Sequence, residues 1–223
     1  MTKETCWTLI QAANGGDPRA QEGFAERYLP PVKAYLRARW RNGPLISECD
    51  DAVQEVFVRC FADSSPLSRI SRTDQGGFRA FLYGICRNVA REFEQKRVRH
   101  AEPADIAMHD VEKEDSRLTK IFDRAFARQV MKEARDLFEA RSHAEGEEAT
   151  KRFELLSLRF EKNLPIRDIA RRWQADPAKL HKDYARARRE YRQALLDIVA
   201  EHEPGASSAV VEDTAKHLLD IIG

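Results

Sequence analysis

Apolar residues that recur at intervals of three and four limit this chain to helical structure more than any other feature. The period is clearest in FRAFLYGICRNVAREFEQKR, residues 78–97. Its apolar members are Phe78, Phe81, Leu82, Ile85, Val89 and Phe93. That spacing places side chains on one face of an α-helix, whereas a half-buried strand needs alternation. No stretch shows strand-like alternation, and glycine and proline number only 10 and 9 in 223 residues. The sequence therefore predicts an all-α protein.

The opposite face of this helix is basic. Arg79, Tyr83, Arg87 and Arg91 recur every four residues and form a second stripe. A solvated face normally mixes both signs of charge, but here no acidic residue precedes Glu92. On this helix alone two interpretations stay open: a solubilising surface, and a surface that binds an anionic partner.

Charge is distributed unevenly along the chain. The formal net charge is only +1, which taken alone does not point to nucleic acid. Residues 78–99, however, carry six basic and two acidic side chains, and residues 179–192 carry the same numbers. Each segment thus has a local charge of +4. Two basic helices in an otherwise balanced chain are typical of a surface that binds a phosphate backbone.

The composition is that of a globular protein with one large core or two small ones. Charged residues make up 34% of the chain and hydrophobic residues 42%. No apolar run approaches 18 residues and no charged-then-apolar leader is present, so we expect neither a membrane span nor a secretory signal. The four cysteines are scattered, without a CxxC pair, which favours reduced thiols and a cytoplasmic location.

Local signals place the first helices. A short helix is expected near residues 7–13, and Asp17-Pro18 begins the next, with an acceptor at the N-cap and a proline at the first helical position. Pro30-Pro31 is expected to break this helix. A further helix then runs to about Trp40.

Two more helices complete the first predicted domain. Residues 47–61 have an apolar face with Ser47 as the expected cap, and the helix at residues 78–99 follows a polar loop. Residues 17–99 are therefore expected to form a compact four-helix domain.

The rest of the chain is also predicted to be helical. Residues 100–111 are polar and irregular and favour a linker, and an amphipathic helix follows at residues 113–141. A final helix, residues 211–222, carries five apolar side chains on one face: Val211, Ala215, Leu218, Leu219 and Ile222. The predicted organisation is a first domain at residues 1–99, a linker with the long helix at 100–147, a second domain at 148–200 and a C-terminal extension at 201–223.

Residues 165–192 carry the sharpest local signal, a helix-turn-helix. PIRDIARRW is a short helix, QAD is a turn of suitable length, and Asp176-Pro177 starts the second helix. The residues expected to face inward are Ile166, Ile169, Ala170, Trp173, Leu180, Tyr184, Ala187 and Tyr191. A basic second helix after a tight turn is what entry into the DNA major groove requires. An ordinary helical hairpin is the alternative.

Two adjacent carboxylates, Asp50 and Asp51, raise the question of catalysis or metal binding. Gln54 and Glu55 lie on the same helix, but no histidine stands at ligand spacing. The chain also lacks a glycine-rich phosphate loop, GxSxG and HExxH. We therefore expect no enzymatic activity, no metal and no cofactor. An acidic, amide-bearing face suits an arginine-rich partner helix better.

Three segments, taken in order, resemble those of an alternative sigma factor of bacterial RNA polymerase, of the two-domain extracytoplasmic-function group. DDAVQEVFVRCF, residues 50–61, is similar to the segment of the first sigma domain that binds the polymerase clamp helices. Residues 78–97 are similar to the adjoining segment that captures and melts the minus-10 promoter element. Residues 153–195 are similar to the second domain, which reads the minus-35 element. Together the likeness covers most of residues 5–200.

The resemblance implies three groups of site residues. The implied polymerase-binding residues are Asp50, Asp51, Gln54 and Glu55. The implied minus-10 DNA-binding residues are Arg79, Tyr83, Arg87, Asn88, Arg91 and Lys96. The implied minus-35 DNA-binding residues are Lys179, Lys182, Asp183, Arg186 and Arg189. In this assignment the arginines hold phosphates, Tyr83 stacks, and Asn88 with the loop before Phe78 lies nearest the flipped base. Phe81 stands where the family often has tryptophan, and we expect it in the core.

The implied partners are core RNA polymerase and promoter DNA, with no membrane and no small-molecule substrate. This sequence departs from the common pattern at Asp183, where the recognition helix is often basic, so the promoter sequence is not transferable. The segment 203–223 is an addition to the minimal pattern. We expect its helix to dock on this protein, with a regulatory partner protein or disorder as the alternatives.

A stand-alone helix-turn-helix transcriptional regulator, dimerising through its other helices, is the second functional hypothesis. Such a regulator needs neither the acidic face at residues 50–55 nor a second basic helix. An enzyme is the third, and no catalytic motif supports it.

Overall fold

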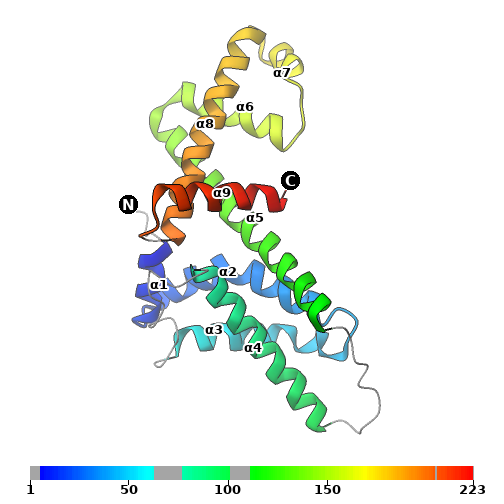
Figure 1. Ribbon diagram of the computed structural model, residues 1–223. Coiled ribbons are helices and arrows are strands. Elements are labelled where there is room, and N and C mark those ends of the chain that lie inside the picture. Colours follow the sequence, from blue (N-terminus) through cyan, green and yellow to red (C-terminus); the bar gives the residue numbers. More distant parts are fainter. Residues whose placement is uncertain (1–5, 63–76, 101–110, 204, 223) are drawn as a thin grey trace. The chain divides into compact units, whose positions relative to one another are not determined.

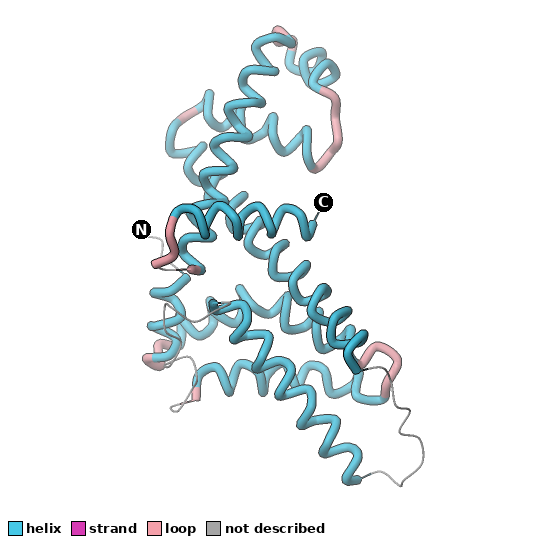
Figure 2. The backbone as a smooth tube through the Cα atoms, viewed as in Figure 1, coloured by secondary structure: helices cyan, strands magenta, loops and turns pink. Residues whose placement is uncertain are grey.

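The protein is all-α, as the sequence predicts. The computed structural model describes residues 6–62, 77–100, 111–203 and 205–222, and every regular element within these ranges is helical (Figure 1, Figure 2). The elements are α1 (Cys6–Asn14), α2 (Pro18–Arg39), the 3-10 helix η1 (Pro44–Glu48), α3 (Cys49–Phe61), α4 (Gly77–His100), α5 (Val111–Glu145), α6 (Glu147–Phe160), α7 (Ile166–Trp173), α8 (Pro177–His202) and α9 (Ser208–Ile222).

Contacts divide the chain into two compact units. The first unit is Met1–Gln129 with Ala200–Gly223, and the second unit is Val130–Val199. Both boundaries fall inside helices, because α5 and α8 each contribute residues to both units. The segment predicted to link two domains, residues 100–111, lies almost entirely outside the described residues.

The core of the first unit is aromatic. Phe24 and Tyr28 of α2 are fully buried, and the Tyr28 ring lies 4.6 Å from that of Phe78 on α4. The apolar stripe predicted for residues 78–97 is the face of α4 that packs inward: Phe78, Leu82, Ile85 and Val89 are buried, and Phe81 and Phe93 are half-buried. The three-and-four spacing of that stripe thus positions its arginines on the other side of α4.

Helix α2 continues through Pro30 and Pro31, so the predicted break is wrong. Each proline removes a backbone hydrogen bond and normally ends or kinks a helix. Here Pro31 is buried, and Tyr28, Val32 and Tyr35 on either side are wholly inaccessible. Packing of both halves into one core holds the helix together across the two missing hydrogen bonds.

One of the two predicted caps in this region forms. The Asp17 carboxylate accepts hydrogen bonds from the backbone N–H groups of Arg19 and Ala20 at 2.9 and 3.5 Å, which confirms the predicted start of α2. The predicted Ser47 cap is wrong: the Ser47 hydroxyl donates to the Pro44 carbonyl within η1 at 3.0 Å. Ser47 therefore belongs to η1, and α3 begins after it, at Cys49.

The second unit contains the helix-turn-helix. Gln174 adopts the left-handed conformation with φ 50°, which ends α7, and Asp176 accepts from the Ala178 backbone N–H at 3.0 Å to start α8. The buried cluster between the helices is Leu155, Ile166, Ile169, Ala170 and Leu180, with Trp173 and Tyr184 packed against it. The predicted inward faces of both helices are therefore confirmed as apolar packing surfaces.

Helix α9 belongs to the first unit. Val211, Ala215 and Leu218 are buried, whereas Leu219 is 43% exposed, so only part of the predicted five-residue face is covered. Thr214 donates to the Glu203 carboxylate at 3.4 Å, which ties the helix to the end of α8.

Candidate nucleic-acid and protein interfaces

The predicted protein-binding face on α3 is mostly exposed. Asp50, Asp51 and Gln54 are exposed and Glu55 is half-buried. Asp50 pairs with Lys33 of α2 at 2.8 Å, and this hydrogen bond lowers the pKa of the Asp50 carboxyl. The helix brings all four side chains to one surface of the first unit.

Glu55 also takes part in an internal network. Arg59 donates to Glu55 at 2.7 Å and, through both terminal nitrogens, to Glu92 of α4 at 2.6 Å. The Arg59 hydrogen bonds lower the pKa of Glu92, with burial opposing the shift. Glu55 therefore stabilises the α3–α4 contact indirectly, which leaves Asp51 and Gln54 more available to an external partner.

Val58 also belongs to this surface and was not among the residues predicted from the sequence. Its side chain is 62% exposed, one helical turn beyond Gln54 and two beyond Asp51. The signal was present in the sequence, because Val58 lies off the apolar stripe formed by Val53, Val56 and Cys60. Protein interfaces commonly have an apolar centre within a polar rim, and Val58 beside Asp51 and Gln54 offers both kinds of side chain.

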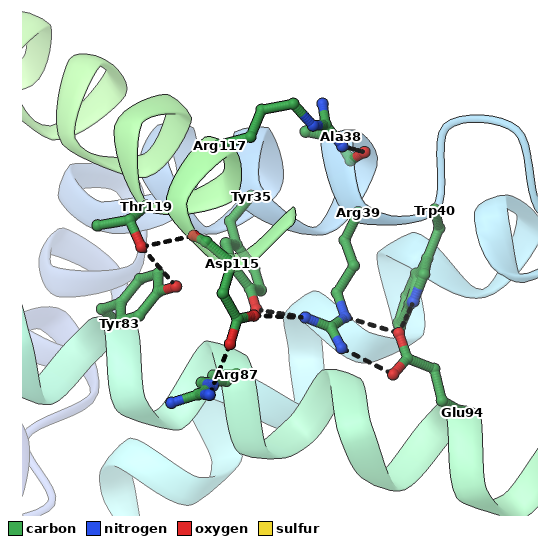
Figure 3. A network of polar contacts seen from close by, with 10 residues as sticks. All are labelled: Tyr35, Ala38, Arg39, Trp40, Tyr83, Arg87, Glu94, Asp115, Arg117 and Thr119. Carbon is green, nitrogen blue, oxygen red and sulfur yellow. Dashed lines mark hydrogen bonds and ion pairs between the residues drawn. The ribbon is translucent and has the colours of Figure 1, made fainter. Parts of the chain in front are cut away.

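The basic stripe of α4 is only partly free. Arg79 Nε donates to Asp123 of α5 at 2.9 Å, and Arg87 Nη2 donates to Asp115 of α5 at 2.6 Å. Between them Tyr83 hydrogen-bonds to the Thr119 hydroxyl at 2.8 Å, as Figure 3 shows for Tyr83 and Arg87. Three predicted minus-10 residues thus contact α5 of the same unit.

The remaining predicted residues of α4 face solvent. Asn88, Arg91 and Lys96 are exposed, and the Lys96 ammonium lies 5.6 Å from the Phe93 ring centre. Arg91 helps to line an open pocket of about 540 Å³, together with Arg39, Glu94, Gln95, Val98 and Arg99. The loop before Phe78, predicted to lie nearest a flipped base, is outside the described residues.

Glu94 organises the polar residues between α2 and α4. It accepts two hydrogen bonds from Arg39, at 2.6 and 2.8 Å, and one from the Trp40 indole at 3.0 Å (Figure 3). Arg39 also donates to the Tyr35 hydroxyl at 3.1 Å and lies 3.8 Å from Asp115. Burial raises the pKa of Tyr35 to about 12, so the phenol stays protonated.

The sequence predicted no role for the polar residues of α5 that contact α4, although part of the signal was visible in it. Asp115, Thr119 and Asp123 recur every four residues on the polar side of α5, the same interval as the basic stripe of α4. That the two stripes meet is a tertiary fact, and the intervals alone did not reveal it.

The predicted DNA-reading face of α8 is exposed in the second unit. Lys179, Lys182, Arg186 and Arg189 are exposed, and Asp183 is half-buried. Arg186 donates to Glu190 at 2.9 Å.

Glu190 in turn connects α8 to α6. It accepts two hydrogen bonds from Arg152, at 2.9 and 3.0 Å, and Arg152 is only 6% exposed. Burial acts to raise the pKa of Glu190, but the hydrogen bonds from Arg152 and Arg186 prevail and lower it. The basic face is thus fixed to its own domain core through a charged pair.

Two further findings bear on chemistry. Within the described residues, no cluster of three or more histidine, cysteine, aspartate or glutamate side chains is placed to bind a metal ion. No helix in the described part of the chain is both long enough and apolar enough to cross a membrane.

Neither a family model nor a curated protein matches this sequence.

Proposed function

We propose that this protein is an alternative sigma factor of the extracytoplasmic-function type, which binds core RNA polymerase and directs it to promoters. The observation that carries the proposal is a helix-turn-helix whose second helix presents Lys179, Lys182, Arg186 and Arg189 to solvent. Their spacing along α8 suits a helix that lies in a major groove with its flanks on phosphates.

The first unit supports the same proposal through two surfaces. On α3, Asp51, Gln54 and Val58 form an exposed acidic and apolar strip that suits a basic partner helix. On α4, Arg91, Lys96 and Arg99 form an exposed basic strip suited to phosphates. A protein that bridges polymerase and DNA needs both.

In this role the protein performs no chemistry of its own and needs no cofactor. It acts where polymerase and chromosomal DNA are, in the cytoplasm. The resemblance of residues 50–61, 78–97 and 153–195 to sigma-factor segments gives the order of functions along the chain: polymerase binding, minus-10 capture and minus-35 reading.

A pull-down with bacterial core RNA polymerase tests the proposal. The wild-type chain should be retained, and Asp51→Lys should abolish retention while helical content stays unchanged. Glu26→Lys is the matched control, because this exposed residue of α2 gives the same change in charge. Retention of the α3 variant would remove this face from the interface. DNA binding by a wild-type chain that fails to bind polymerase would instead favour a stand-alone regulator.

A further inference from the structure

Two helices of the first unit meet through complementary stripes. From α4 come Arg79, Tyr83 and Arg87, and from α5 come Asp123, Thr119 and Asp115, paired in that order. Both stripes have an interval of four residues, and the numbers run in opposite directions because the helices are antiparallel. We call these three pairs the α4–α5 ladder.

In the ladder, two carboxylates of α5 bind the arginines that are predicted to bind DNA phosphates. Asp115 and Asp123 are eight residues apart, which corresponds to about 12 Å along a helix. A carboxylate and a phosphate offer an arginine the same kind of charged acceptor oxygens. At Tyr83, Thr119 occupies the hydroxyl, and the ring lies 5.4 Å from that of Phe122, so α5 also covers the predicted stacking residue.

The arginines of the ladder keep access to solvent. The Arg79 and Arg87 side chains are each 37% exposed, whereas Asp123 and Asp115 are 13% and 24% exposed. Within the described residues, Arg87 Nε is buried without a hydrogen-bond partner. Asp115 therefore leaves part of the hydrogen-bonding capacity of Arg87 unused.

The basic surface of α4 continues beyond the ladder. Arg91, Lys96 and Arg99 are exposed on the last turns of the helix, and Arg91 and Arg99 line the open pocket beside Glu94. The surface thus has a covered part at residues 79–87 and an open part at residues 91–99. A nucleic acid strand is able to contact the open part while α5 is still in place.

We propose that residues 115–123 of α5 are a built-in competitor for nucleic acid on α4. In this arrangement Asp115, Thr119 and Asp123 occupy the basic stripe in the free protein, and a strand bound at Arg91 and Arg99 displaces them. The proposal rests on the proposed function, since it takes α4 as a nucleic-acid surface. It adds a restraint on that surface which the likeness to sigma factors does not imply.

The strength of the ladder suits a displaceable contact. The arginine side chains are 37% exposed and the carboxylates 13% and 24%, so water and salt screen these ion pairs in part. With a competitor of this kind, the apparent affinity for nucleic acid is the intrinsic affinity multiplied by the fraction of molecules in which the competitor is displaced from the basic stripe. Removing both carboxylates is therefore expected to tighten binding about five-fold, well short of the effect of a fully buried pair.

The test is binding of a short, fluorescein-labelled single strand of mixed sequence to the full chain, measured by anisotropy at low salt. Asp115→Asn with Asp123→Asn should bind the strand about five-fold more tightly than Asp213→Asn with Asp220→Asn. The control pair lies on exposed positions of α9 in the same unit and makes the same change in net charge. Adding Arg79→Ala and Arg87→Ala to the ladder variant should abolish the gain.

Two results would overturn the proposal: equal affinity of the ladder and control variants, or a gain that persists without Arg79 and Arg87. If the double variant loses helical content, the single variant Asp115→Asn is measured instead. It should bind the strand about two-fold more tightly than the control. No gain would overturn the proposal. The pull-down with core polymerase tests the proposed function separately. If the ladder variant shows the gain but the chain fails to bind core polymerase, the competitor proposal stands and the sigma-factor proposal is wrong.

Discussion

Glu94 is the residue whose loss should destabilise the first unit most clearly among its exposed or half-buried acids. It receives three hydrogen bonds, two from Arg39 and one from Trp40, and joins α4 to α2. These contacts raise the pKa of Arg39, with the hydrogen bond to Glu94 as the main cause. Glu94→Gln keeps the size of the side chain but offers one acceptor oxygen and turns an NH₂ group toward donors.

The magnitude follows from the number and exposure of these bonds. A hydrogen bond to a charged group contributes about 1.5–3 kcal/mol when buried. The Arg39 side chain is 15% exposed and that of Glu94 34%, so the lower end of the range applies. Losing the charge and at least one bond outright should lower the free energy of unfolding by about 2 kcal/mol. For a unit of this size that corresponds to a fall in Tm of about 4–8 °C.

Urea and thermal denaturation followed by circular dichroism measure this change. Glu26→Gln is the matched control, because Glu26 is an exposed acid of α2 in the same unit, and it should change stability by less than about 0.5 kcal/mol. Equal stabilities of the two variants would refute the reasoning. They would mean that solvent screening leaves the Arg39–Glu94–Trp40 network without net effect.

Four further outcomes are expected. Lys182→Ala and Arg186→Ala should each weaken binding to minus-35 DNA in a titration against promoter DNA. The loss should be about 1–3 kcal/mol where the side chain contacts a base and less where it contacts a phosphate. Unchanged binding would mean that another surface reads the DNA. Cys60 and Cys86 are buried, and burial raises the pKa of the Cys60 thiol to about 12 and also raises the pKa of the Cys86 thiol. A thiol reagent at pH 8 should therefore label them only after unfolding. Their contribution to stability is complete below the unfolded thiol pKa of 9.0 and should decline as pH rises above it, which alkaline denaturation of Cys60→Ala against wild type checks. Deleting residues 204–223 should increase affinity for core polymerase and protease sensitivity, and unchanged affinity would assign the tail to another partner.

Local rules predicted the helices well and their continuity less well. The stripe at residues 78–97, the Asp17 cap and the Gln174–Asp176 turn all follow from interactions within a few residues, which a sequence displays directly. The continuation of α2 through Pro30 and Pro31 does not, because it depends on burial of Tyr28 and Val32 against other helices. A helix whose two halves share one core tolerates what an isolated helix does not.

The candidate site shows the same division. Exposure of Asp51, Arg91 and Lys182 followed from their positions opposite apolar stripes. The pairing of Arg79 and Arg87 with α5 was not predictable in this way, since the chain contains two basic helices that could pair with the acidic stripe of α5. Phe122 packs beside Tyr83 where the two stripes meet, and these residues are 39 positions apart in the chain. The spacing of charged residues along a helix identifies candidate binding faces, and tertiary packing decides which of these faces are exposed.

Run-off transcription with purified core RNA polymerase on a promoter library tests the central claim most directly. Core polymerase supplied with this protein should initiate at a defined subset of promoters that core polymerase alone does not use. Arg186→Ala should change which promoters are used, and Asp51→Lys should abolish initiation. Transcripts that are the same with and without the protein, from a chain that is fully helical and binds DNA, would contradict the sigma-factor account.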